Sequence, residues 1–123
     1  ALEVLKDKDF VYVHIEAPDE CGHRAETENK VLSIELIDKK ILAPVLEYLE
    51  SCGDDFGVMV LPDHPTPVRL RKHTSAPVPY FMYSSQKKAD GESCFTEATA
   101  EAKNAFMPDG SKLMQSFIDY CVK

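Results

Sequence analysis

The chain has 123 residues, 44% of them hydrophobic, which is enough for one ordinary domain with a core of its own. Its 14 lysine and arginine residues stand against 21 aspartate and glutamate residues, so the formal net charge is −7. This sign argues against general affinity for nucleic acids or anionic membranes. No apolar run approaches the roughly 20 residues that cross a bilayer, and the first ten residues lack the regions of a signal peptide. We therefore expect a cytoplasmic protein with a single domain over residues 1–123 and four reduced cysteines.

Residues 10–15 are predicted to form a first strand, because they are β-branched and aromatic and are followed by Ala-Pro-Asp. A long amphipathic helix is predicted from about Thr27 to Cys52, where apolar residues recur at three- and four-residue steps. Pro44 lies inside this helix and removes a backbone hydrogen bond. We therefore expect a kink or a break near residues 40–43.

A second strand is predicted over residues 56–61, which are apolar at nearly every position, as in a sheet covered by helices on both faces. A third strand over residues 78–83 contains Pro79, which suits the beginning of a strand or an edge strand. Two more helices are predicted, near residues 96–104 and from about residue 111 to residue 122. This order of elements predicts an α/β layered domain.

Two pairs of an acid and a histidine follow the first two predicted strands. Asp19 and His23 come after the first strand, and Asp63 and His64 come directly after the second, in a loop with three prolines. Open α/β sheets place ligand sites at such strand ends, and carboxylate and imidazole together bind zinc, manganese or iron. Each pair alone also fits a capping aspartate beside a solvated histidine. The repetition favours a shared metal site.

His73 precedes the third predicted strand and would complete a cluster with Asp19 and His23. If His73 reaches the same strand ends as Asp63, the third strand runs antiparallel to the second. His14 lies within the first predicted strand, so we expect it to be packed and hydrogen-bonded and assign it no metal role.

Four basic residues stand beside the proposed metal loops in this acidic chain, and an anionic substrate would explain their position: Arg24, Arg69, Arg71 and Lys72. Arg24 is the preferred contact for a phosphate or carboxylate, because a guanidinium binds such groups in a forked geometry. An ion pair of Arg24 with Glu20 or Glu26 explains its position equally well.

Several segments together resemble the archaeal-type cofactor-independent phosphoglycerate mutases, a branch of the alkaline phosphatase superfamily. The segments are HIEAPDECGHR at residues 14–24, ELID at 35–38, LPDHPTP at 61–67 and HTSAPVP at 73–79. The resemblance implies a three-layer α/β/α core with a mostly parallel sheet and one antiparallel strand. It also implies interconversion of 2- and 3-phosphoglycerate through a phosphoserine intermediate.

The same resemblance implies two divalent metal ions, manganese, zinc or magnesium. The family's pattern assigns Asp19, His23 and His73 to one ion and Asp63 and His64 to the other. No serine of this chain matches the family's nucleophile, which lies in an N-terminal half outside this sequence. We therefore expect the chain to supply metal ligands and to be inactive alone.

The implied partners are the N-terminal half of the same protein and a phosphorylated small-molecule substrate. A related phosphohydrolase or a homoserine-kinase-like phosphotransferase would show nearly the same ligands. A further alternative is a non-catalytic metal-binding or assembly module that associates with itself through an exposed sheet edge.

Overall fold

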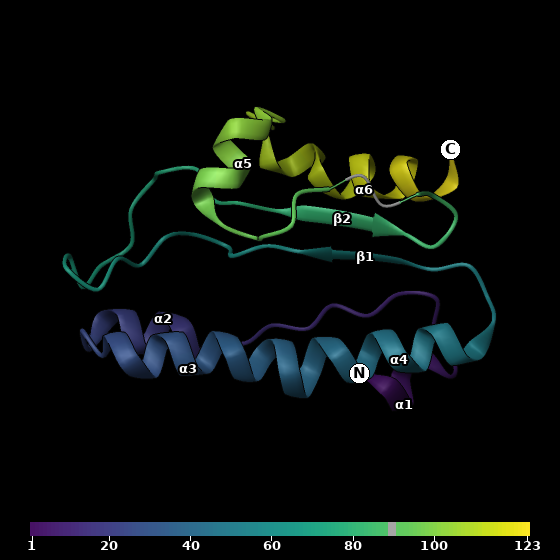
Figure 1. Ribbon diagram of the computed structural model, residues 1–123, viewed down its shortest axis with the longest axis horizontal. Coiled ribbons are helices and arrows are strands. Elements are labelled where there is room, and N and C mark those ends of the chain that lie inside the picture. Colours follow the sequence, from purple (N-terminus) through teal and green to yellow (C-terminus); the bar gives the residue numbers. More distant parts are fainter. Residues whose placement is uncertain (89–90) are drawn as a thin grey trace. The chain divides into compact units, whose positions relative to one another are not determined.

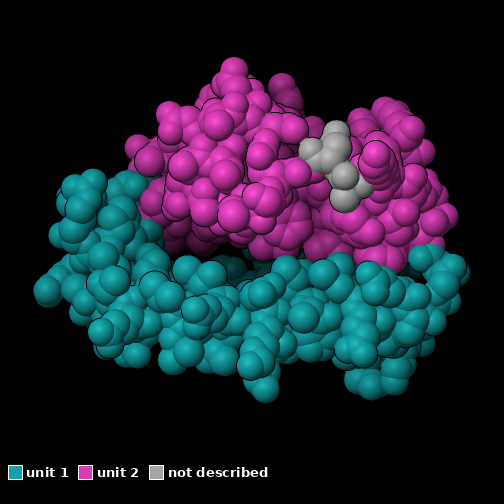
Figure 2. Space-filling model, in the orientation of Figure 1, with its two compact units in different colours: residues 1–54, 66–74 teal, residues 55–65, 75–123 magenta. Residues whose placement is uncertain are grey.

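The computed structural model describes residues 1–88 and 91–123 (Figure 1). The chain divides into two compact units, which Figure 2 draws in different colours. Unit 1 contains residues 1–54 and 66–74, and unit 2 contains residues 55–65 and 75–123. Unit 1 is helical, whereas unit 2 combines a small sheet with helices, so the chain is of the α/β class. No helix in the part of the chain described is long and apolar enough to cross a membrane.

Unit 1 begins with three helices. They are α1 (Leu2–Leu5), α2 (Ala17–His23) and α3 (Thr27–Ile37). Pro18 lies in the first turn of α2, where a backbone N–H would have no partner within the helix, so proline is well tolerated there. Ala25 adopts a positive φ of 56° between α2 and α3, and these two helices pack against each other.

A π-helical segment interrupts the long helix where Pro44 predicted a break. It is η1 (Asp38–Leu42), which joins α3 to α4 (Ala43–Cys52). Pro44 lies in the first turn of α4 and offers no N–H to the carbonyl one turn before it, so the backbone widens its turn there. Gly53, with φ 74°, ends α4 in a left-handed conformation. The predicted helix is confirmed, and the irregularity expected near Pro44 is present as this π-helical segment within one continuous helical run.

The predicted strand over residues 10–15 is wrong. This segment has no regular secondary structure, and most of its side chains are exposed. A β-branched sequence forms a strand only when a neighbouring strand completes its backbone hydrogen bonds, and the described part of unit 1 contains no strand. His14 is therefore exposed rather than packed, and its Nε2 lies 3.9 Å from the carboxylate of Glu16.

Unit 2 is built on two antiparallel strands, β1 (Gly57–Val60) and β2 (Phe81–Ser84). Val58 lies opposite Tyr83 in the ladder. The predicted second strand and the antiparallel direction of the third are confirmed. The third strand begins later than predicted, after Pro79, which has no N–H to donate to the ladder. The three-layer, mostly parallel sheet stays a prediction, because the sheet described has these two strands only.

The two predicted helices after the third strand are confirmed. They are α5 (Glu97–Lys103) and α6 (Leu113–Val122), the latter preceded by the 3-10 turn η2 (Gly110–Lys112). Thr96 caps α5, because its hydroxyl accepts from the backbone N–H of Thr99 at 3.2 Å.

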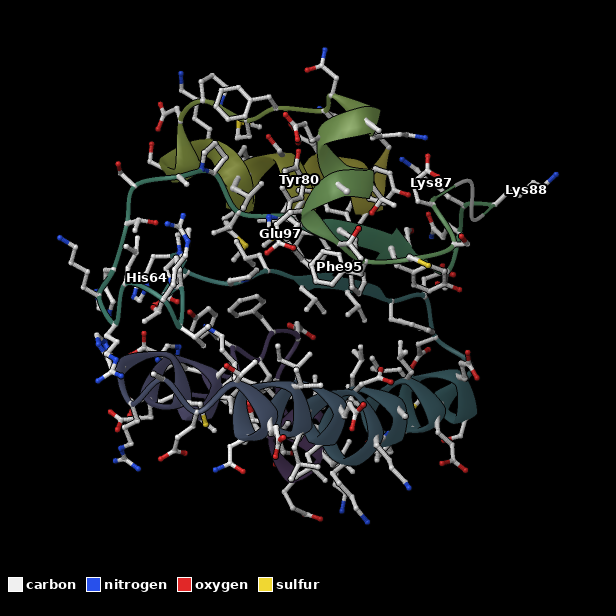
Figure 3. The ribbon with its side chains drawn as sticks, turned by 60° about the vertical axis from the view of Figure 1, so that its left-hand side comes forward. His64, Tyr80, Lys87, Lys88, Phe95 and Glu97 are labelled. Atoms are coloured by element: carbon white, nitrogen blue, oxygen red, sulfur yellow. The ribbon has the colours of Figure 1, made fainter. Side chains whose placement is uncertain are left out.

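Helix α6 packs closely on the sheet, and Gly57 makes the close approach possible. A Cβ atom at Gly57 would lie 2.3 Å from Cys121 Sγ and 3.2 Å from the ring of Phe117. Burial in this contact raises the pKa of the Cys121 thiol. In the same unit the hydroxyl of Tyr80 donates to the carbonyl of Ala105 at 2.8 Å, and the rings of Phe81 and Phe95 meet edge to face. Figure 3 labels Tyr80 and Phe95.

Neither unit encloses the hydrophobic core that the composition led us to expect. Within residues 1–88 and 91–123, no hydrophobic side chain is fully buried. The buried polar residues there are Thr66, at 4% exposure, and Ser84, at 2%. Small units have a high ratio of surface to volume, so each leaves much of its apolar surface exposed.

Candidate metal centre

Asp19 and His23 lie on one face of α2, not in a loop after a strand as predicted. Their spacing of four residues places the two side chains one helical turn apart. His23 Nε2 lies 3.3 Å from Asp19 Oδ2. The helix therefore presents a carboxylate and an imidazole side by side.

His73 joins this pair from a loop fifty positions further along the chain. Its Nε2 lies 3.0 Å from His23 Nε2 and 3.2 Å from Asp19 Oδ1. One ligand atom from each of the three residues lies within 4.8 Å of the other two. The structure thus brings together, within unit 1, the three residues that the resemblance assigns to one ion. We call Asp19, His23 and His73 the ligand cluster.

The donor atoms of the ligand cluster fit a divalent cation. Carboxylate oxygens and imidazole nitrogens that face each other at 3.0–3.3 Å repel one another unless a proton or a cation lies among them. Ligands placed tetrahedrally about 2.0–2.1 Å from zinc are about 3.3–3.4 Å apart. Neighbouring ligands of an octahedral ion at about 2.1 Å are about 3.0 Å apart. When each oxygen of Asp19 is taken with the histidine that it faces, the observed separations lie near both values.

The backbone holds the second ring nitrogen of His23. His23 Nδ1 lies 3.0 Å from the carbonyl oxygen of Arg71. Because a carbonyl only accepts hydrogen bonds, Nδ1 carries a proton, and in the tautomer that is protonated on Nδ1 alone the lone pair of Nε2 points toward the cluster. Arg71 has a φ of 53°, a left-handed conformation that is uncommon for a residue with a side chain. That unusual backbone conformation belongs to the residue whose carbonyl orients His23.

Thr66 is a residue of this site that the sequence analysis missed. Its hydroxyl donates to Asp19 Oδ1 at 2.5 Å, and its carbonyl oxygen accepts from Lys30 Nζ at 2.6 Å. A Cβ at Gly22 would lie 2.5 Å from that same carbonyl oxygen, so glycine there leaves room for Thr66. The available sequence signals were a threonine between two prolines beside an Asp-His pair, and a glycine directly before His23.

Asp63 and His64 lie together in unit 2, in the loop after β1, and Figure 3 labels His64. His64 Nε2 lies 3.1 Å from Asp63 Oδ2. The backbone N–H of His64 donates to Asp63 Oδ1 at 3.0 Å. The structure thus forms the predicted acid-imidazole pair in unit 2 and the ligand cluster in unit 1.

Arg24, the predicted substrate contact, forms an ion pair with Glu20 one turn earlier on α2. Its Nη2 donates to Glu20 Oε2 at 2.9 Å, and both side chains are exposed. This is one of the two pairings considered from the sequence. Exposed pairs of this spacing stabilise a helix by only about 0.3–0.5 kcal/mol. An anionic ligand would displace Glu20 at little cost.

The other basic residues of the sequence analysis lie in the loop that carries His73. They are all exposed: Arg69, Arg71 and Lys72.

Comparison with known proteins shows what the chain is similar to. The model of a family described as the metalloenzyme superfamily matches residues 1–112. A 2,3-bisphosphoglycerate-independent phosphoglycerate mutase of Methanosarcina mazei is 43% identical over 102 residues, which are 82% of this chain and 26% of the relative. A mutase of the same name from Methanothrix thermoacetophila is 40% identical over 118 residues, 96% of this chain and 30% of the relative.

A further relative from Geobacter sulfurreducens is described as a probable mutase of the same kind. It is 38% identical over 120 residues, which are 97% of this chain and 30% of the relative. The chain therefore spans less than a third of the length of these curated relatives. No solved structure matches the chain.

Proposed function

The chain belongs to the metalloenzyme superfamily, and from this premise we propose that it is the metal-binding portion of a 2,3-bisphosphoglycerate-independent phosphoglycerate mutase. The observation that carries the proposal is the convergence of Asp19, His23 and His73, whose ligand atoms lie within 4.8 Å of one another. The relatives named for this activity, at 38–43% identity, support the choice of reaction.

In the proposed centre the ligand cluster holds one divalent ion, and Asp63 and His64 hold a second. Such ions, when bound, stabilise the charge on a phosphoryl group during its transfer between oxygens. Imidazole ligands suit zinc or manganese, whereas carboxylates also suit magnesium. Only Pro65 separates His64 from Thr66 in the sequence, and Thr66 donates to Asp19. This short connection along the chain supports assigning both ligand sets to the same reaction.

The remaining roles follow from the chemistry of this chain's own groups and, for the serine nucleophile and the return of phosphate, from the resemblance to the mutase family. The Arg71 carbonyl keeps the proton of His23 on Nδ1, so that Nε2 stays available as a ligand. Arg24 binds the phosphate or the carboxylate of a phosphoglycerate through its guanidinium fork. The serine that receives the phosphate is supplied by an N-terminal portion of the same protein. Phosphate then returns to the other hydroxyl of glycerate, a cytoplasmic reaction of glycolysis and gluconeogenesis.

The same N-terminal portion would complete the fold. The two strands of unit 2 would belong to a larger, three-layer α/β/α domain with a mostly parallel sheet, in which β2 is an antiparallel strand. Two observations support this proposal. The sheet described has two strands only, and the hydrophobic side chains of the described residues all remain at least partly exposed.

Metal content and turnover test the proposed function. The 123-residue chain should bind manganese or zinc but should not convert 3-phosphoglycerate, whereas the polypeptide extended by the N-terminal portion of its relatives should do so. If the 123-residue chain alone converts 3-phosphoglycerate, the proposal that an N-terminal portion supplies the serine nucleophile is wrong. If His23→Ala and Asp63→Ala leave both metal content and turnover unchanged in the extended polypeptide, the ligand assignment is wrong.

The extended polypeptide also separates related activities. Assays with phosphoglycerates, simple phosphomonoesters and phosphohomoserine distinguish a mutase from a phosphohydrolase and from a homoserine-kinase-like phosphotransferase. Hydrolysis of phosphomonoesters without isomerisation of phosphoglycerate would replace the proposed reaction, while leaving the metal centre in place.

A non-catalytic assembly role is the second candidate, and one observation favours it. Within residues 1–88 and 91–123 the sheet has two strands, so each strand has one edge without a described strand beside it. Such edges are places where another chain can pair. Light scattering of the metal-free and the metal-loaded chain tests this role, and a monomer under both conditions would contradict it.

A further inference from the structure

We propose that Thr66 is a positioning residue that fixes the Asp19 carboxylate for metal binding, and that Lys30 acts through Thr66. This inference rests on the proposed function, because it takes Asp19 as a metal ligand. We assign these two residues no contact with the ion or with a substrate. Their effect is on the direction in which the carboxylate oxygens point.

The two oxygens of Asp19 face different imidazoles. Oδ1 lies 3.2 Å from His73 Nε2, and Oδ2 lies 3.3 Å from His23 Nε2. The Thr66 hydroxyl donates to Oδ1 at 2.5 Å, within the range of about 2.5–2.7 Å for a hydroxyl bonded to a carboxylate. This bond fixes the rotation of the carboxylate, so that each oxygen stays directed at the cluster.

Thr66 is itself held from two sides. Lys30, in the first half of α3, donates from Nζ to the Thr66 carbonyl oxygen at 2.6 Å. Gly22, on α2, lies close to the same carbonyl oxygen, because a Cβ built there would approach it to 2.5 Å. Thr66 also lies between Pro65 and Pro67, whose rings restrict the backbone. Two helices and one stiff loop therefore meet at this residue.

The direction of the hydroxyl argues for a role in the metal centre. Thr66 is only 4% exposed, and an apolar side chain of the same shape would fill its position without needing a hydrogen-bond partner. Its hydroxyl instead donates to the carboxylate that faces both histidines of the ligand cluster. Partners of this kind typically change metal affinity by about 10–100-fold.

The experiment titrates the 123-residue chain with Zn²⁺ in an isothermal calorimeter. Asp63→Ala and His64→Ala are introduced first, so that the ligand cluster alone is measured. Thr66→Val keeps the shape of the side chain but removes the donor, and Thr66→Ser keeps the donor. The visible absorption spectrum of the Co²⁺ form reports ligand geometry, and urea unfolding of the metal-free chain reports stability separately.

Thr66→Val should weaken Zn²⁺ binding by about 10–100-fold and change the Co²⁺ spectrum, and Thr66→Ser should restore both. Lys30→Met should weaken binding by about 10-fold, and Lys30→Arg should restore it. If Thr66→Val does not fold, Lys30→Met and Lys30→Arg decide the question.

Unchanged affinity and an unchanged spectrum in Thr66→Val would overturn the positioning role and leave the metal centre intact. The role would also be overturned if Thr66→Val lowered only the stability of the metal-free chain. If the parent chain binds no Zn²⁺, the proposed metal centre fails and the positioning role fails with it.

Discussion

The ligand cluster and the Asp63–His64 pair contain the same chemical groups but are assembled differently. The cluster joins two residues of α2 to a histidine fifty positions away, and a hydroxyl and a carbonyl from other segments orient its members. The pair consists of chain neighbours, and one carboxylate oxygen accepts from the backbone N–H of the next residue. The cluster therefore depends on tertiary packing, whereas the pair depends on local backbone geometry. Substitutions remote from the ligands should disturb the cluster much more than the pair.

Removing a ligand should have the largest effect. His73→Ala should weaken Zn²⁺ binding by the cluster by more than about 100-fold, because partners that only orient ligands already account for about 10–100-fold. Calorimetry on the chain with Asp63→Ala and His64→Ala measures this directly. His14→Ala is the matched control, since His14 is exposed and lies outside the ligand cluster. An equal loss of Zn²⁺ affinity in His73→Ala and His14→Ala would show that the cluster is not the binding site.

Gly22→Ala should disturb the cluster without touching a ligand. The new Cβ would lie 2.5 Å from the Thr66 carbonyl oxygen, so the backbone at Thr66 must shift. We expect a loss of about 1–3 kcal/mol in unfolding free energy and weaker Zn²⁺ binding by the cluster. Urea unfolding and calorimetry check the two effects. Gly110→Ala is the control, because a Cβ there meets nothing within 4 Å. An effect no larger than that of the control would refute the dependence on packing.

Gly57→Ala is the corresponding test in unit 2. Its Cβ would lie 2.3 Å from Cys121 Sγ, so α6 must move away from the strand or the thiol must rotate. The expected cost is about 1–3 kcal/mol of unfolding free energy. Adding Cys121→Ala should cost less than the sum of the single changes, because it removes the clashing atom. If the loss of unfolding free energy in the double mutant equals the sum of the two single losses, residue 57 and Cys121 do not contact each other. Zn²⁺ affinity of the cluster should stay unchanged, since its ligands belong to unit 1.

Arg24→Gln should have the smallest effect on the folded chain. Its exposed ion pair with Glu20 predicts a loss below about 0.5 kcal/mol and no change in Zn²⁺ affinity, although His23 is its chain neighbour. In the extended polypeptide the same substitution should raise the KM for 3-phosphoglycerate. Arg24→Lys should raise it as well, because an ammonium lacks the guanidinium fork. An unchanged KM would remove Arg24 from the substrate site.

Features set by the local chain were predictable from the sequence. The break before Pro44 follows from one missing N–H, and β1 and the helices after β2 follow from short-range patterns. The strand at residues 10–15 was wrong because strand formation requires a distant partner. Asp19 and His23 were placed in a loop because Pro18 was read as the end of a strand. Proline is also common in the first turn of a helix, and here Pro18 is the second residue of α2.

The candidate site likewise contains residues that the sequence predicted and contacts that it did not. The residue types and their repetition pointed to Asp19, His23, Asp63 and His64 before any geometry was known, and His73 was assigned with them through the resemblance to the mutase family. The sequence signals around Thr66 did not identify its partners, and the contacts of Thr66 and Lys30 exist only once α2, α3 and the loop of residues 66–74 pack together. The orientation of His23 depends likewise on a backbone carbonyl, which every residue carries and which no sequence pattern distinguishes.

The π-helical turn η1 adds one residue to a helix that otherwise repeats every 3.6 residues. In a regular α-helix one extra residue would turn everything after it by roughly 100° about the helix axis, and the wider π turn absorbs that rotation. The apolar residues of α4 therefore face a different direction from the one that α3 alone would give them. A regular α-helix through the same residues would turn α4 by roughly that angle, whereas deleting a single residue within Asp38–Leu42 would restore a regular helix and leave α4 facing its present direction.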